Sequence, residues 1–250
     1  MNLLEINPEA RWTTHQLGAG NHKLVIADDF YANVETLRAI ASSLYYLEGE
    51  MHGNFPGARA IISLDTRALV RVLSERWGSP LIEASGAYHP AVFSIILNDG
   101  RRELNEDQRQ PHIDPGISAM VYLNDPQDCA GGTGIYRHRP TGLERIPYEA
   151  TPEVREPARA HNLSQDDLGT PEGFQAFQDQ VVFNPSYAAA GNDYINDGNE
   201  AWELLHLVEM KFNRLVIFDG RMPHSQHLAQ GQFSQAYRLN QILYLKEREG

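Results

Sequence analysis

The sequence is poor in cysteine, with Cys129 as the single example in 250 residues. A lone cysteine cannot form a disulfide within the chain, which favours a reducing compartment. No apolar run approaches the roughly 18 residues needed to cross a bilayer. Residues 1–11 also lack the basic start and apolar run of a signal peptide. We therefore expect a cytoplasmic protein that does not enter membranes.

Basic residues are also scarce, because 21 Lys and Arg face 33 Asp and Glu, for a formal net charge of −12. An acidic surface repels phosphate backbones and anionic lipid heads, so neither nucleic acid nor a membrane surface is an expected partner. A local basic pocket for a small acid is still compatible with this charge. The apolar fraction of 42% is ordinary for a globular protein and allows a real core.

Short apolar runs broken by Gly, Pro, Asn and Asp predict that strands dominate the fold. The expected strands are 25–30, 91–97, 117–123, 134–137, 204–212, 215–218 and 236–245. Helical spacing of apolar residues predicts one helix after Asn33 and another between Asp65 and Gly78. This pattern indicates a mainly β protein with flanking helices (α+β), built on an antiparallel barrel or jelly roll, the group that includes cupins.

We expect a single domain, residues 1–250, with residues 1–90 as helical and strand support. Residues 91–138 and 202–250 are the expected jelly-roll core, which contains a polar loop at 98–110. Residues 139–201 interrupt it with six prolines and one helix-like piece at 171–182. So long an excursion in a compact domain is typical of a functional lid or of partly disordered chain, and a lid is the preferred interpretation.

A candidate metal site begins at His112 and Asp114, just before the predicted strand 117–123. In extended chain, residues two apart project to the same side, so both side chains can meet one ion. His224, which follows the apolar run 215–218 and a turn, is the best third ligand, with His227 and His138 as alternatives. Two imidazoles and one carboxylate leave three coordination positions open, the arrangement of Fe(II) oxygenases.

Five sequence blocks follow one another in a recognisable order. They are His112-Ile113-Asp114, Val121-Tyr122-Leu123-Asn124, Gly131-Gly132-Thr133-Gly134-Ile135-Tyr136, Phe218-Asp219 through Pro223-His224, and Tyr237-Arg238. This order resembles the prolyl-hydroxylase-like branch of the 2-oxoglutarate/Fe(II)-dependent dioxygenase superfamily. The resemblance covers roughly residues 93–244, and it implies a double-stranded β-helix (jelly roll, cupin-like) core.

The resemblance also implies Fe(II), the cosubstrate 2-oxoglutarate and O2, with His112, Asp114 and His224 as the catalytic metal ligands. Arg238 would bind the distal carboxylate of 2-oxoglutarate, because a guanidinium is permanently charged and matches a carboxylate in shape. Tyr122 would add a hydroxyl, and Thr133 could also touch the cosubstrate. The 14-residue step from His224 to Arg238 is longer than is usual in the family, so a surface arginine remains the alternative for Arg238.

The implied reaction is hydroxylation of an unactivated C–H bond in a peptide prolyl or amino-acid substrate or a small molecule, with release of succinate and CO2. The carboxylate of Asp114 favours hydroxylation, desaturation or cyclisation over halogenation, since related halogenating enzymes lack it. Two other functions remain open. One is a cupin-like metal-binding protein without 2-oxoglutarate chemistry, and the other is a non-catalytic relative that acts through protein contacts. The sequence sets neither the substrate nor the oligomeric state.

Overall fold

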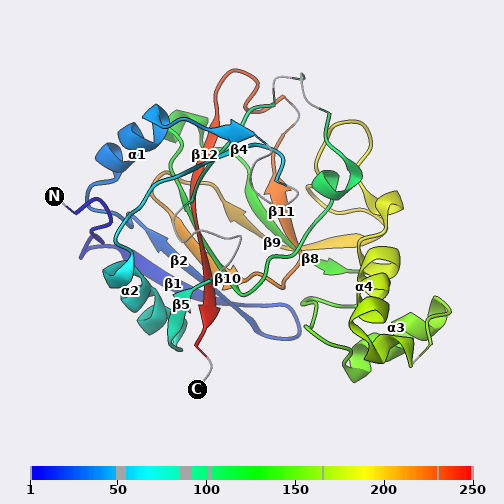
Figure 1. Cartoon of the computed structure of the whole chain (residues 1–250). Helices are drawn as coiled ribbons and strands as arrows, with labels where there is room; N and C mark the ends of the chain where they lie inside the picture. The colour runs from blue at the N-terminus through cyan, green and yellow to red at the C-terminus, as the bar shows by residue number, and fades with distance from the viewer. Residues whose placement is uncertain are drawn as a thin grey trace.

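The structure is a computed structural model, and it describes residues 2–48, 55–84, 92–98, 100, 103–164, 166–229 and 231–248. These residues form a mostly antiparallel β structure with a few helices, shown in Figure 1. The expected mainly β class with flanking helices is therefore confirmed. None of the helices among the described residues is long and apolar enough to span a membrane.

Strands among the described residues form two sheets, and every strand pair is antiparallel. The large sheet has the spatial order β1 (Arg11–Leu17), β2 (His22–Asp28), β10 (Leu215–Asp219), β7 (Ile117–Tyr122), β12 (Arg238–Glu247), β6 (Val92–Ile96), β4 (Ala58–Ile61) and β3 (Leu47–Glu48), with β5 (Leu81–Glu83) paired to β12. The small sheet has the order β11 (His224–His227), β8 (Gly132–His138) and β9 (Trp202–Glu209).

Two helices cover one face of the large sheet, on the side of the molecule opposite the helices α3 (Pro152–Ala160) and α4 (Pro171–Phe177) (Figure 1). They are α1 (Val34–Ser43) and α2 (Arg67–Trp77). Each buries an apolar stripe, Leu37 with Ala41 and Leu69 with Leu73, in one cluster with sheet residues such as Phe93. Helical spacing puts these pairs on one side of each helix, so burial against the sheet stabilises both elements.

The other face of the large sheet packs on the small sheet. Tyr122 and Val216 from the large sheet share a second apolar cluster with Ile135 and Val208 from the small sheet. Since one face of each strand points into this cluster, both sheets hold their strands in a fixed register.

Helices α3 (Pro152–Ala160) and α4 (Pro171–Phe177) pack on the small sheet in a third cluster that includes Tyr136 and Trp202. The α4 helix continues as a π-helical turn, Gln178–Val182. Four short 3-10 segments complete the described elements: Glu106–Arg109, Pro126–Asp128, Asp167–Gly169 and Pro185–Tyr187. The single-domain prediction and the lid role of residues 139–201 stay predictions.

Most of the expected elements are present within a few residues of their predicted bounds. The start of the strand expected at 91–97 and part of the loop expected at 98–110 lie outside the described residues. Thr66 takes the N-cap position of α2, although the Asp65 carboxylate still accepts a hydrogen bond from the Arg67 backbone N–H at 3.2 Å. The strands β1, β4 and β11 and the helix α3 were not expected, because each is short or carries many polar residues.

Candidate metal centre

The backbone itself places His112 beside His224. The two residues form an isolated antiparallel β-bridge, in which each backbone N–H donates to the other's carbonyl at 2.9 Å. Two residues further along, the Asp114 N–H donates to the Gly220 carbonyl at 2.7 Å. Residues 112–114 therefore run antiparallel to residues 220–224, the turn that leads into β11, and residues 112 apart in sequence become neighbours.

Gly220 allows this close approach. A Cβ at residue 220 would lie 2.8 Å from the Asp114 carbonyl oxygen and 2.9 Å from the Ser118 Oγ, closer than real Cβ atoms come to other heavy atoms. Any larger residue would therefore push the turn away from Asp114. The Ser118 hydroxyl also donates to the Asp114 carboxylate at 3.3 Å, so the start of β7 orients that side chain.

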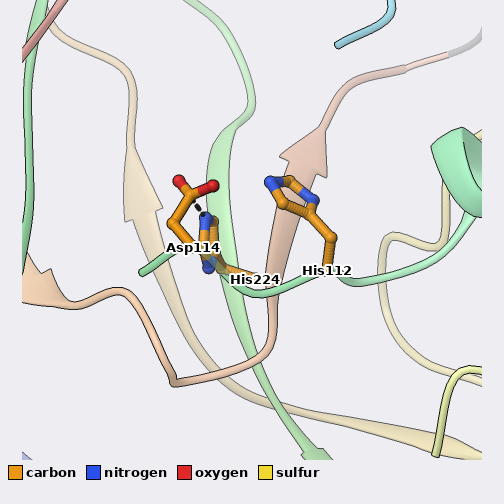
Figure 2. A group of neighbouring side chains, drawn as sticks. All are labelled: His112, Asp114 and His224. Carbon is orange, nitrogen blue, oxygen red and sulfur yellow. Dashed lines mark ion pairs between the residues drawn. The ribbon is translucent and has the colours of Figure 1, made fainter. Parts of the chain in front are cut away.

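The side chains of His112, Asp114 and His224 converge, as Figure 2 shows. Their nearest ligand atoms all lie within 4.8 Å of one another, and His224 Nε2 is 3.5 Å from Asp114 Oδ2. Donors about 2.1 Å from one ion and at right angles to each other are about 3 Å apart. A small side-chain movement therefore brings this set around a single metal ion. Among the described residues no other group of three such donors meets this distance.

The protonation states also suit a metal. His224 Nδ1 lies 2.8 Å from the Met222 carbonyl oxygen, which can only accept, so Nδ1 carries the proton and Nε2 is left for a metal. Burial, together with the charges of His224 and Arg59, lowers the pKa of His112 to about 4 despite the opposing charge of Asp114. His112 keeps exposed surface and lines a cavity.

Asp114 is held in its ionised form. Burial alone would raise its pKa, but the hydrogen bond and charge of His224, with His112 and Arg59, outweigh it and lower the pKa to about 2. A neutral His112 imidazole and an ionised Asp114 carboxylate are the forms that bind metals, and with His224 this set leaves coordination positions open for exogenous ligands.

A cavity of about 220 Å³ opens beside the three side chains, between the two sheets. The large sheet lines it with alternate residues, of which Ser118 and Met120 come from β7 and Arg238, Asn240 and Ile242 from β12. The apolar part of the wall continues with Phe218, whose ring packs edge-on against His224 at 4.8 Å. The donor set thus faces a partly apolar cavity that is partly open to solvent.

Arg238 lies in this cavity and is 4% exposed, so it is not a surface arginine. Its guanidinium lies 5.8 Å from the centre of the Tyr122 ring and donates to the Gly132 carbonyl at 3.4 Å. With the Asn240 amide turned so that its oxygen faces the guanidinium, that oxygen accepts from Arg238 at 3.0 Å. No carboxylate of the described residues pairs with Arg238, and burial lowers its pKa.

Tyr122 and Thr133 lie beside Arg238 but differ in access. Tyr122 is fully buried, and its hydroxyl lies 2.7 Å from the Thr133 Oγ1. Burial raises the pKa of Tyr122. Thr133 lines the cavity, so its hydroxyl is the nearer of the two to a ligand. The structure thus gathers all three predicted cosubstrate residues at one end of the cavity.

The alternative histidines do not join the site. His227 Nε2 lies 3.5 Å from Asp197 at the surface. His138 is fully buried against Trp202, with Nδ1 2.8 Å from the Thr141 hydroxyl. Burial lowers the pKa of His138 to about 4. Both histidines therefore have structural surroundings of their own, and His224 is the one that meets His112 and Asp114.

Sequence analysis missed Arg59, a second arginine in the cavity. It stands on β4, a short strand with no motif around it. The available signal was a single arginine inside the apolar run 58–62, where alternation with Ala58 and Ala60 predicts that it faces the opposite side of a strand from them.

A family model described as "Family of unknown function (DUF6445)" matches residues 8–169 and 158–238 of the chain. No curated protein matches the sequence.

Two solved structures are similar to the chain. One is the crystal structure of HygX from Streptomyces hygroscopicus with iron bound, with 12% identity, a TM-score of 0.36, and coverage of 95% of this chain and 82% of that chain. The other is a prolyl-4-hydroxylase from Pseudomonas putida, with 14% identity, a TM-score of 0.30, and coverage of 96% of this chain and 93% of that chain. Both TM-scores are below 0.5, so neither likeness supports a conclusion about fold or activity.

Proposed function

The chain belongs to DUF6445, a family of unknown function, and we propose that it is an Fe(II)- and 2-oxoglutarate-dependent dioxygenase. It hydroxylates an unactivated C–H bond of a small molecule, an amino acid or a peptide prolyl residue, and releases succinate and CO2. The observation that carries the proposal is the convergence of His112, Asp114 and His224 in one cavity with the buried, carboxylate-free Arg238.

The order of the strands supports a double-stranded β-helix core, made of β6 to β12. The chain runs through β6 and β7 in the large sheet, crosses to β8 and β9 in the small sheet, returns for β10, crosses again for β11 and returns for β12. Such alternation between two facing antiparallel sheets is typical of jelly-roll proteins. In this arrangement the first residues of β7 and of β11 lie at the same cavity, next to His112, Asp114 and His224.

His112, Asp114 and His224 would hold the iron. The donor set fits Fe(II), since two imidazoles and one carboxylate on one side of the ion leave adjacent positions for a bidentate oxo-acid and O2. When bound, the iron supplies the O2 chemistry that couples decarboxylation of 2-oxoglutarate to oxidation of the substrate. The protein's own contribution is to keep Asp114 ionised and to fix the His224 tautomer through Met222.

Arg238 would bind the distal carboxylate of 2-oxoglutarate. Its buried guanidinium has a hydrogen-bonding nitrogen, Nε, without a partner among the described residues. A carboxylate would satisfy that donor and offset a charge that burial disfavours. The Thr133 hydroxyl, fixed by Tyr122, lies on the same side and can donate to the same carboxylate.

The remaining parts of the proposal rest on composition and on the insert. The acidic net charge supports a small-molecule or peptide substrate over nucleic acid, and the single cysteine supports a cytoplasmic location. Residues of the insert, among them Gln178 and Phe183, line a second hollow that borders His112. This position supports a lid role for residues 139–201.

Anaerobic binding tests the proposal directly. Purified protein is titrated with Fe(II) and then with 2-oxoglutarate, and the visible charge-transfer absorption of an iron–oxo-acid chelate is recorded. Succinate release is then measured after O2 is added. We expect wild-type protein to form the chelate, and Arg238→Gln to weaken 2-oxoglutarate binding at least about tenfold while Fe(II) binding persists, because a charge-assisted hydrogen bond contributes about 1.5–3 kcal/mol.

A matched control is Arg67→Gln, since Arg67 is an exposed arginine on α2 that pairs with Asp65. It should bind 2-oxoglutarate as the wild type does. Iron binding without 2-oxoglutarate binding or succinate release would instead indicate a cupin-like metal-binding protein. Absence of both iron and 2-oxoglutarate binding would indicate a non-catalytic relative.

A further inference from the structure

Arg59 is the second cation of the cavity, and the sheet register puts it there. In β4 it pairs with Ser94 of β6, which pairs with Asn240 of β12, which pairs with Tyr122 of β7. Residues paired across a sheet share a face, so Arg59 projects to the side of Asn240 and the metal ligands. It is 9% exposed and lines the same cavity as His112 and Asp114.

Two aromatic rings hold the Arg59 guanidinium in place. The group lies 4.5 Å from the centre of the Phe55 ring and 6.0 Å from that of Tyr244, and its Nη2 donates to the Tyr244 hydroxyl at 3.1 Å. Its Nε is buried and has no hydrogen-bond partner among the described residues. Cation–π contacts orient a guanidinium but do not neutralise it, and a buried N–H without an acceptor destabilises the ligand-free state.

No carboxylate of the described residues forms an ion pair with Arg59, although the charge of Arg59 helps to lower the pKa of Asp114. Other arginines in the molecule do have one, as in the pairs Arg214–Asp28 and Arg137–Glu203. Asp107 also lines the cavity, but it is exposed and forms no ion pair with Arg59. Asp114, the remaining acidic residue of the cavity lining, belongs to the metal-ligand set.

The guanidinium groups of Arg59 and Arg238 contact different residues of the cavity wall. Arg238 contacts Tyr122 and Gly132, next to Thr133. Arg59 contacts Tyr244, whose cross-strand partner is Ser118, and the Ser118 hydroxyl donates to Asp114.

Charge accounting then points to a second anion. With iron at +2, 2-oxoglutarate at −2 and Asp114 at −1, the two arginines leave the buried part of the site with one positive charge in excess. A carboxylate group of the substrate would offset this charge locally, and a guanidinium with an unpaired Nε is suited to a carboxylate.

We propose that Arg59 binds a carboxylate of the substrate, so that the enzyme acts on a small organic acid, such as a free amino acid, and not on an internal residue of a polypeptide. This inference rests on the proposed function and narrows its substrate class. The cavity size agrees with it, because about 220 Å³ is below the roughly 300–1,000 Å³ of pockets for drug-sized ligands.

The test uses ligand binding, so that it does not depend on turnover. The full chain is loaded with Mn(II) and N-oxalylglycine, an unreactive analogue of 2-oxoglutarate. It is then titrated, by thermal shift and calorimetry, with the free L-amino acids and simple carboxylic acids, each beside its primary amide. We expect at least one acid to bind, and its amide to bind at least tenfold more weakly. Arg59→Gln should lower the affinity for the acid at least tenfold and leave the affinities for its amide and for N-oxalylglycine unchanged.

Two further variants complete the design. Arg59→Lys, which keeps the charge, should recover part of the affinity for the acid. Arg238→Gln should lower the affinity for N-oxalylglycine, which Arg59→Gln should leave unchanged. Retained N-oxalylglycine binding by Arg59→Gln also shows that this variant is folded.

Several results would overturn the inference alone. The wild-type protein could bind no acid of the panel, or it could bind acid and amide with equal affinity. Arg59→Gln could also leave the affinity for the acid unchanged. Loss of N-oxalylglycine binding in folded Arg59→Gln would assign Arg59 to the cosubstrate instead. Wild-type protein that binds neither Mn(II) nor N-oxalylglycine would overturn the proposed function and this inference together.

Discussion

The two faces of the large sheet are made by the same strands, but they carry different kinds of side chain. On β12, Leu239 and Leu243 point toward α1 and α2, while Arg238 and Asn240 point into the cavity. The helix-covered face is almost wholly apolar. In its buried polar pair the Tyr31 hydroxyl donates to Gln241 at 2.8 Å, and Gln241 Nε2 is the polar atom there without a partner among the described residues.

The cavity face leaves more polar groups unpaired, two of them on charged side chains. Ser94 Oγ and the Nε atoms of Arg59 and Arg238 are buried there without a hydrogen-bond partner among the described residues. Unpaired buried groups destabilise a fold unless a ligand satisfies them, and the two arginines lie where a ligand can do so. The difference indicates that one face of the sheet stabilises the protein and the other is arranged for binding.

The largest effect is expected on the helix-covered face. Leu243→Ala should lower the free energy of unfolding by about 2–5 kcal/mol, because the side chain is fully buried and its removal leaves a cavity. Its chain neighbour Ile242, which is half-buried and lines the ligand cavity, is the matched control, and Ile242→Ala should lose only about 1 kcal/mol. Urea denaturation of both variants measures this.

The two variants also separate stability from binding. At a temperature where Leu243→Ala is folded, it should bind Fe(II) and 2-oxoglutarate as the wild type does. Equal losses of stability for Leu243→Ala and Ile242→Ala, or a large loss of ligand affinity in Leu243→Ala, would contradict the division between the faces.

The next largest effect is expected at the metal ligands. His224→Ala should weaken Fe(II) binding at least about 100-fold, because changes to groups behind a metal ligand already cost 10–100-fold. His227→Ala, on the same strand but paired with Asp197 at the surface, is the control and should bind iron normally. Equilibrium dialysis measures the Fe(II) affinity of both variants. A lower Fe(II) affinity in His227→Ala than in His224→Ala would make His227 the ligand in place of His224.

Much of the fold could be predicted because its strands repeat strong local patterns. The apolar run at 215–218 and the alternation at 236–245 each identify a strand without tertiary information. β11 could not be predicted in this way, because His224 to His227 is a polar stretch that is a strand only through pairing with β8. β4 is similar, as a four-residue strand held by β6 and β3.

The candidate site was partly predictable for a similar reason. His112 and Asp114 share a side by local geometry, but their meeting with His224 depends on hydrogen bonds between residues 112 apart, which no local pattern contains. Choosing His224 over His227 needed the motif order, and the register of β11 then put His224 in the cavity. Arg59 was missed because its role depends on the neighbours that β4 acquires in the sheet. Asp219 pairs with Arg145 at 2.5 Å, a contact across 74 residues that no local pattern contains, while its carboxylate also accepts from the Arg221 backbone N–H at 2.9 Å.

The smallest expected effect is on stability, and it is opposite in sign to that of most substitutions, which destabilise a protein. Arg238→Met should stabilise the ligand-free protein by about 1 kcal/mol, because burial lowers the pKa of Arg238, which means that the folded state disfavours its charge. The methionine keeps much of the buried apolar stem and removes the uncompensated charge. Saturating 2-oxoglutarate, at about 100 times its dissociation constant, should then stabilise the wild type by about 2.7 kcal/mol and the variant not at all.

Arg214, which forms an ion pair with Asp28, is the control for Arg238. Arg214 donates from Nε to Asp28 at 2.6 Å, and its hydrogen bond is the main cause that lowers the pKa of Asp28 to about 2. Arg214→Met should therefore destabilise the protein, by up to about 1 kcal/mol, with or without 2-oxoglutarate. Urea denaturation of the two variants, each with and without 2-oxoglutarate, tests the contrast. If Arg238→Met also destabilises the ligand-free protein, the cavity arginine is structural in the same sense as Arg214, and the two faces of the sheet do not differ in the way argued above.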